Sequence, residues 1–137
     1  MGESIGVERL LPHGPEARML REIVQADGER LEARARVPAG GLLIAGGAAP
    51  AFLALEIAAQ AAAAHGALAA PGGAPPRSGL LVGAKDVTLH VVTLPVGRDL
   101  VVRVRRTASA PPLFVYEAEL DVDGAAAFHG TLSAWVE

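Results

Sequence analysis

The sequence predicts an α+β domain in which one long helix covers a face of an antiparallel sheet. Three features predict it: a strictly alternating stretch before residue 40, an almost uncharged middle segment, and a final third made of alternating runs separated by turn residues. With 137 residues, no repeat of solenoid length and no linker, the chain is expected to form a single domain over 1–137.

The first clear strand is expected at Leu31–Val37. Apolar residues alternate there with charged ones, as in a strand with one buried face. The turn residues Ala26–Glu29 come before it, and Ile23 and Val24 would end an earlier strand. We therefore expect a hairpin at this point.

The middle segment predicts the helix. Between Arg36 and Arg77 the only acidic or basic side chain is Glu56, whereas average composition would place about eight there. Proline at 50 suits the first helical position and glycine at 66 suits the stop, so a helix is expected from about Pro50 to His65. It is apolar nearly all round, as a helix is when other structure encloses it.

Alternating runs in the last third predict further strands at Leu80–Val92, Asp99–Ala108, Leu113–Val122 and Ala126–Val136. The Asp-Gly pair at 123–124 is a strong hairpin signal. Basic residues alternate along the second of these runs and acidic residues along the third. The two sets are therefore expected to face each other and to help set the register.

Composition argues against several classes of partner. The formal charge of -3 and the aromatic content of 4% do not suit nucleic-acid binding. The apolar stretch 40–64 is long enough to suggest a membrane span, but it carries Glu56 and Gln60 near its middle. We therefore expect no membrane span. The absence of cysteine and of a secretory signal favours the cytoplasm. No phosphate loop is present and the histidines lack metal-ligand spacing, so neither cofactor nor metal is expected.

Three stretches resemble a known family. They are Leu11-Pro12-His13 with Pro15, the helix sequence from Pro50 to Gln60 ending in E-x-x-A-Q, and the run from Leu81 to Gly97. The chain resembles the hot-dog-fold 3-hydroxyacyl-acyl carrier protein dehydratases, and most of all the predicted branch of aryl-polyene-type pathways. The resemblance implies a sheet wrapped around the helix, an acyl thioester on acyl carrier protein or coenzyme A as ligand, and a homodimer or higher oligomer.

The resemblance also implies a site around the start of the helix. Glu56 would act as general acid or base, and the N–H of Ala51 would polarise the thioester carbonyl in a pocket that includes Phe52 and Leu42. From helix geometry, Gln60 lies one turn beyond Glu56 on the same face, where it would contribute to the pocket and could hold the carboxyl by hydrogen bonding. General dehydratases carry a catalytic histidine fourteen residues before this glutamate, and here that position is Leu42.

His13 is the best histidine candidate for catalysis in this chain. Its place in the family pattern differs from that of the missing base, so the usual pair of catalytic residues is incomplete.

Because of this departure, three functions are open: a 3-hydroxyacyl thioester dehydratase, a non-catalytic acyl-binding module or heterodimer partner, and an acyl thioesterase. Serine hydrolysis is not supported, since none of the serines lies in a nucleophile motif.

Overall fold

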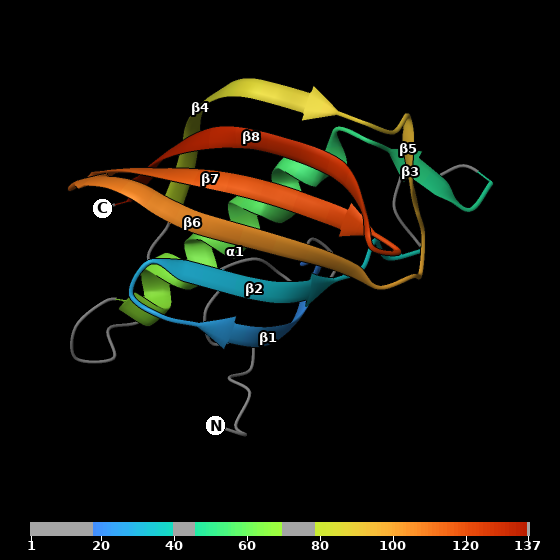
Figure 1. The fold of residues 1–137 in the computed structure, drawn as a ribbon, viewed down its shortest axis with the longest axis horizontal. Helices are drawn as coiled ribbons and strands as arrows, with labels where there is room; N and C mark the ends of the chain where they lie inside the picture. The colour runs from blue at the N-terminus through green and yellow to red at the C-terminus, as the bar shows by residue number, and fades with distance from the viewer. Residues whose placement is uncertain (1–17, 40–45, 70–78, 137) are drawn as a thin grey trace.

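The computed structural model describes residues 18–39, 46–69 and 79–136. Their elements are β1 Leu20–Ala26, β2 Arg30–Ala35, β3 Ala48–Pro50, α1 Leu53–Ala69, β4 Gly79–Leu89, β5 Thr93–Pro95, β6 Leu100–Ala110, β7 Leu113–Val122 and β8 Ala125–Val136. A six-stranded sheet runs in the order β1-β2-β6-β7-β8-β4, and β3 pairs with β5 in a separate two-stranded ribbon. Figure 1 shows α1 lying across one face of the curved sheet, with β1 and β4 at the two edges.

The expected hairpin before residue 40 is confirmed, with β1 and β2 antiparallel. Asp27 shapes its turn, because its carboxylate accepts hydrogen bonds from the N–H groups of Glu29 and Arg30, both at 2.8 Å. The second strand is shorter than expected. It ends at Ala35, and Val37 makes only an isolated bridge to Val96.

The helix lies about three residues later than predicted. Pro50 ends β3, where it faces Thr93 of β5, so it does not start the helix. Gly66 does not stop the helix either, which continues to Ala69. A glycine inside a helix costs only about 1 kcal/mol relative to alanine, and Ala67 and Leu68 beyond it pack against the core.

All four later strands are present, although the first ends earlier than predicted, at Leu89. Asp123 and Gly124 both have positive φ, at 51° and 80°, which is the geometry of a tight type I′ hairpin turn. The strand β4 pairs with β8 and forms an edge of the sheet. The short ribbon of β3 and β5 was not predicted, since three-residue strands carry too little pattern to be read.

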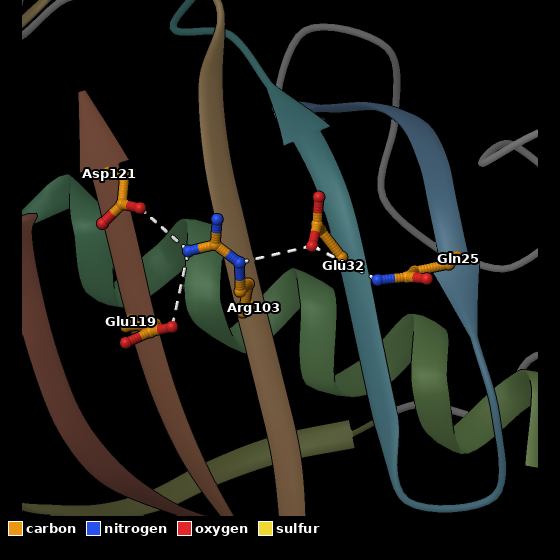
Figure 2. Close-up of polar contacts among 5 residues, drawn as sticks. All are labelled: Gln25, Glu32, Arg103, Glu119 and Asp121. Carbon is orange, nitrogen blue, oxygen red and sulfur yellow. Dashed lines mark hydrogen bonds and ion pairs between the residues drawn. The ribbon is translucent and has the colours of Figure 1, made fainter. Parts of the chain in front are cut away.

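The two faces of the sheet differ in chemistry. The inner face is apolar and packs on α1, with residues such as Leu31, Val102, Leu120 and Phe128 fully or almost fully buried. The outer face of the central strands carries charge, as expected from the alternation. In Figure 2, Arg103 of β6 lies between Glu32 of β2 and two carboxylates of β7.

The expected pairing of basic with acidic residues across β6 and β7 is confirmed. Arg103 faces Glu119 and Arg105 faces Glu117 in the register. Arg103 forms ion pairs with Asp121 at 2.8 Å, Glu32 at 3.3 Å and Glu119 at 3.4 Å. The charged outer face therefore reinforces the register that the apolar inner face requires.

The expected fold, an antiparallel sheet curved around one long helix, is confirmed, and one stripe of the helix remains only half-buried. The helix packs against β1, β2, β6, β7 and β8, while β4 lies beyond it. In the described part of the chain no helix is both long enough and apolar enough to cross a membrane.

Candidate active site

Glu56 lies in the first turn of α1 and is the only acidic or basic residue of the helix. Its side chain is half-buried. Phe52, Ala59 and Ala63 lie on the same helix face, because residues three or four apart share a face, and they too are half-buried or exposed. The carboxylate therefore interrupts an otherwise apolar stripe on the side of α1 that the sheet does not cover.

Phe52 is the most exposed residue of this stripe, with 52% of its surface accessible. It precedes the first residue of α1 and sits one turn before Glu56. An aromatic ring left open to solvent beside a half-buried carboxylate is typical of a surface that another molecule covers.

Gln60 is fully buried one turn after Glu56. Its side-chain oxygen accepts hydrogen bonds from the N–H groups of Met19 at 2.8 Å and Leu20 at 3.3 Å. Its position one turn along the helix predicted that this amide holds Glu56 in place. These two hydrogen bonds give Gln60 a further role, because they join the start of β1 to the helix across some forty residues of sequence.

Ala51 does not offer the unpaired N–H group expected from its place in the first turn of the predicted helix. The group donates to the carbonyl oxygen of Val92 at 3.1 Å, and Ala51 itself is buried. The reason is that the helix begins at Leu53, so Ala51 belongs to the turn that follows β3 and lies beside the chain leaving β4. The N–H groups of Ala54 and Leu55, in the first turn of the helix, donate to the carbonyl oxygens of Ala51 and Phe52, both at 3.0 Å.

A second apolar surface lies along β4. Leu89 faces Phe128 in the register and Leu81 faces Ala134, so both lie on the inner, helix-side face of the sheet. Leu81 is 40% exposed and Leu89 is 42% exposed. Because α1 does not cover β4, this face and the stripe containing Glu56 both remain open.

The structure describes three of the four histidines. His13 lies outside the described residues, as does Leu42. His65, four residues before the last helix residue Ala69, is fully buried and hydrogen-bonds the hydroxyl of Tyr116 and the carbonyl of Asp27. His90 and His129 are both exposed, with ring centres 5.3 Å apart.

The sequence matches the family model of the ApeP dehydratase, called ApeP-like, over residues 5–136. The chain belongs to the ApeP-like dehydratase family. No curated protein gives a significant match to its sequence. The family match covers nearly the whole chain, including the helix with Glu56 and Gln60 and the strand β4.

Several solved structures share the hot-dog fold of this chain. The dehydratase heterocomplex ApeI:P from Xenorhabdus doucetiae matches with a TM-score of 0.84 and 20% identity, over 98% of this chain and 93% of that one. Cj0977, a virulence protein from Campylobacter jejuni, matches with a TM-score of 0.70 and 13% identity, over 96% and 87%. A hypothetical thioesterase with coenzyme A from Streptococcus pneumoniae matches with a TM-score of 0.61 and 11% identity, over 85% and 84%.

Two features of the site were missed from the sequence: the carbonyl of Val92 that engages Ala51, and the open apolar face of β4. A signal for the second was present. From Leu80 to Val92 apolar residues fall on both alternating positions, which indicates a strand covered on both faces.

Proposed function

We propose that this ApeP-like protein is a cytoplasmic hydro-lyase that eliminates water from a 3-hydroxyacyl thioester, with Glu56 as the group that transfers the proton. The observation that carries the proposal is the position of Glu56. It is the one carboxylate of α1, half-buried, at the helix start and within an apolar stripe that the sheet leaves open. That arrangement suits a thioester whose acyl chain lies along the helix and whose reacting carbons lie beside the carboxylate.

The reaction breaks the C2–H and C3–O bonds of the substrate and forms the C2–C3 π bond and, with a proton from the general acid, the O–H bond of the departing water. A proton leaves C2, the C3–O bond breaks as the hydroxyl departs as water, and the C2–C3 double bond of the trans-2-enoyl thioester forms. A general base, a general acid and a donor to the carbonyl oxygen are needed. Glu56 supplies one of the first two roles, and His13 is our candidate for the other.

The carbonyl of the thioester would be held at the start of α1. The N–H of Ala51, expected for this role, already donates to Val92, so it would act only if the substrate carbonyl displaced that bond. We therefore assign the role to the next N–H groups, those of Phe52 and Leu53, where the helix dipole also favours a developing negative charge.

Acyl carrier protein and coenzyme A are both proposed as carriers of the thioester. The structurally similar protein from Streptococcus pneumoniae contains coenzyme A, and the hot-dog dehydratases that the sequence resembles act on acyl carrier protein. Either carrier presents the same reacting group, so the chemistry at Glu56 is common to both.

The proposal is tested by giving the purified protein 3-hydroxyacyl and trans-2-enoyl thioesters. Enoyl conjugation is followed in the ultraviolet and free thiol is measured in parallel. We expect interconversion of the two thioesters by the wild type, a loss of about a hundredfold or more in Glu56→Gln, and little change in Glu117→Gln, whose side chain is 54% exposed on the outer face. Equal rates in the Glu56 and Glu117 variants would contradict the proposal.

The other functions predict different results in the same assay. Release of thiol that depends on Glu56 would identify a thioesterase. Binding of acyl thioester with neither product would identify a non-catalytic acyl-binding subunit, as the leucine at position 42 allows.

We further propose that the open edge of β4 pairs with a second hot-dog subunit. Exposed apolar side chains gather on this strand, namely Leu81, Val82, Val87 and Leu89, and its outer edge is unpaired in the sheet. An edge of this kind favours association with another strand. A second copy would close the stripe containing Glu56 and make a homodimer. The ApeI:P heterocomplex favours a related but different subunit as the alternative.

Light scattering after gel filtration tests this interface. Leu81→Lys is expected to shift the protein toward monomer, whereas Val24→Lys, at a 44% exposed position on the opposite edge strand, is expected to leave the assembly unchanged. A wild-type monomer that assembles only after addition of a second hot-dog protein would identify the heterodimer.

A further inference from the structure

We propose that His90 and His129 form a two-histidine site for a divalent transition-metal ion, with Zn²⁺ the best fit. The two residues are 39 positions apart in the sequence and are brought together by the pairing of β4 with β8. The inference does not depend on the proposed dehydratase activity.

The backbone on both sides of the pair is fixed. His129 faces Thr88 in the register of β4 and β8, and the N–H of His90 donates to the carbonyl of Ala127 at 2.8 Å, which continues the pairing past the end of β4. Since residues two apart on a strand share a face, His90 and Thr88 project to the same side as His129. Both imidazoles lie on the outer face and are exposed.

The distance between the rings suits a shared ion. A zinc–nitrogen bond of about 2.0–2.1 Å places the ion roughly 3.2 Å from the ring centre, so two imidazoles on one tetrahedral ion have centres about 5.2 Å apart. The observed separation is 5.3 Å, with the ring planes at 42°. Small rotations of the two side chains would direct one nitrogen of each ring toward a common point without moving the backbone.

The surrounding charge favours a cation. His129 and Asp86 line one end of a groove of about 780 Å³ that crosses the outer face, and carboxylates outnumber arginines in its lining, five to three. Glu119 is directly opposite His129 on β7. An acidic groove concentrates cations at its surface, and imidazole nitrogen selects zinc, copper and nickel over magnesium or calcium.

The site would be open rather than enclosed. In the described residues no cluster of three or more histidine, cysteine, aspartate or glutamate side chains suits a metal ion. Water would therefore complete the coordination of an ion held by His90 and His129. This two-histidine site therefore differs from a structural zinc site with four protein ligands. Its two ligands come from different strands, so the spacing of histidines in the sequence did not reveal the site.

The position of the two-histidine site connects it with the start of α1. His90 lies two residues before Val92, whose carbonyl accepts the N–H of Ala51. An ion that joins His90 to β8 would hold the end of β4 against the sheet and so restrain the chain that anchors the beginning of α1. Metal occupancy would raise the stability of the folded state by mass action.

The test uses full-length protein without an affinity tag, stripped with chelator and titrated with zinc chloride by calorimetry. The wild type is expected to bind one Zn²⁺ per chain and to show a rise in Tm with zinc. His90→Gln and His129→Gln should each weaken binding by about tenfold or more and abolish the rise. Thr88→Ala, on the same face, removes none of the side-chain types that usually bind zinc and should bind as the wild type does.

Zinc binding of wild-type strength in the doubly substituted His90→Gln, His129→Gln protein would overturn the proposal, because other groups would then hold the ion. A wild type that binds zinc no more tightly than the double variant would overturn it as well. Far-ultraviolet circular dichroism of each variant checks that the fold is retained, and these exposed substitutions are not expected to disturb it.

Discussion

The imidazole of His65 is bound to the hydroxyl of Tyr116, with 2.8 Å between Nδ1 and the phenolic oxygen. Its other nitrogen, Nε2, lies 3.0 Å from the carbonyl oxygen of Asp27. A carbonyl only accepts, so Nε2 carries the proton and Nδ1 accepts from the Tyr116 hydroxyl. This pair of hydrogen bonds joins α1 to β7 and to the turn of the first hairpin, and both side chains are buried.

The His65 contact predicts a pH dependence of stability. Burial is the main cause that lowers the pKa of His65 below its usual 6.5, and the positive charge of Arg106 acts in the same direction. Because the folded pKa lies below the unfolded one, the unfolded chain binds more protons between the two values. The contribution to stability is therefore complete above about pH 6.5 and is lost as the pH falls toward the folded pKa.

Urea unfolding measured between about pH 7.5 and pH 5 checks this. His65→Gln is expected to lower the free energy of unfolding by about 1–3 kcal/mol at neutral pH and to make it less sensitive to acid. His129→Gln, at an exposed position and with all proteins stripped of metal by chelator, serves as the control and should retain the wild-type slope. An unchanged slope in the His65 variant would show that other groups cause the acid sensitivity.

Gly130 is predicted to be required because of its neighbour on β4. A Cβ at position 130 would lie 3.0 Å from Cγ2 of Val87 and 3.3 Å from its Cα, where β4 has a bulge. Gly130→Ala should therefore destabilise the protein by about 1–3 kcal/mol.

Gly83→Ala is a matched control for Gly130 in the same pair of strands, since its nearest atom is 4.0 Å away. The double variant Val87→Ala, Gly130→Ala should recover part of the stability that Gly130→Ala loses, as measured by Tm in thermal unfolding. Equal effects of the two glycine substitutions would refute the steric explanation.

Gln60 is predicted to hold the start of β1. Gln60→Leu leaves the buried N–H groups of Met19 and Leu20 without the oxygen that accepts from them, at a cost of about 1–3 kcal/mol. Faster hydrogen exchange at these two amides, measured by NMR, would identify the cause. Gln25→Leu, on the exposed side of β1, should change neither stability nor exchange. Undisturbed protection of Met19 and Leu20 in the Gln60 variant would rule the anchor out.

Arg103 is predicted to give a salt-dependent contribution. It contacts three carboxylates and is 41% exposed, whereas Arg98, 58% exposed, pairs with Asp123. Arg103→Gln should lower the free energy of unfolding by about 1 kcal/mol at low ionic strength, and Arg98→Gln by less. The difference should shrink in about 1 M salt, where the screening length falls to about 3 Å. A loss that persists undiminished in salt would point to packing of the Arg103 stem instead.

Local pattern determined the class of fold and most of its elements. The alternation from Leu31 onward, the uncharged helix around Glu56 and the Asp-Gly turn at 123–124 each predict structure within a few residues, because side-chain periodicity and turn chemistry act locally. Glu56 also stood out from the sequence, as the one charge in an apolar segment.

Only the tertiary structure decided which surfaces and groups meet. The pairing of β4 with β8 brought His90 to His129 and left an apolar edge open, and the late start of the helix committed the N–H of Ala51 to Val92. Gln60 reached Met19, and His65 reached Tyr116, across forty or more residues. Such contacts depend on the order of the strands in the sheet and on where the helix lies on it. The hydrophobic periodicity of a single segment determines neither of these.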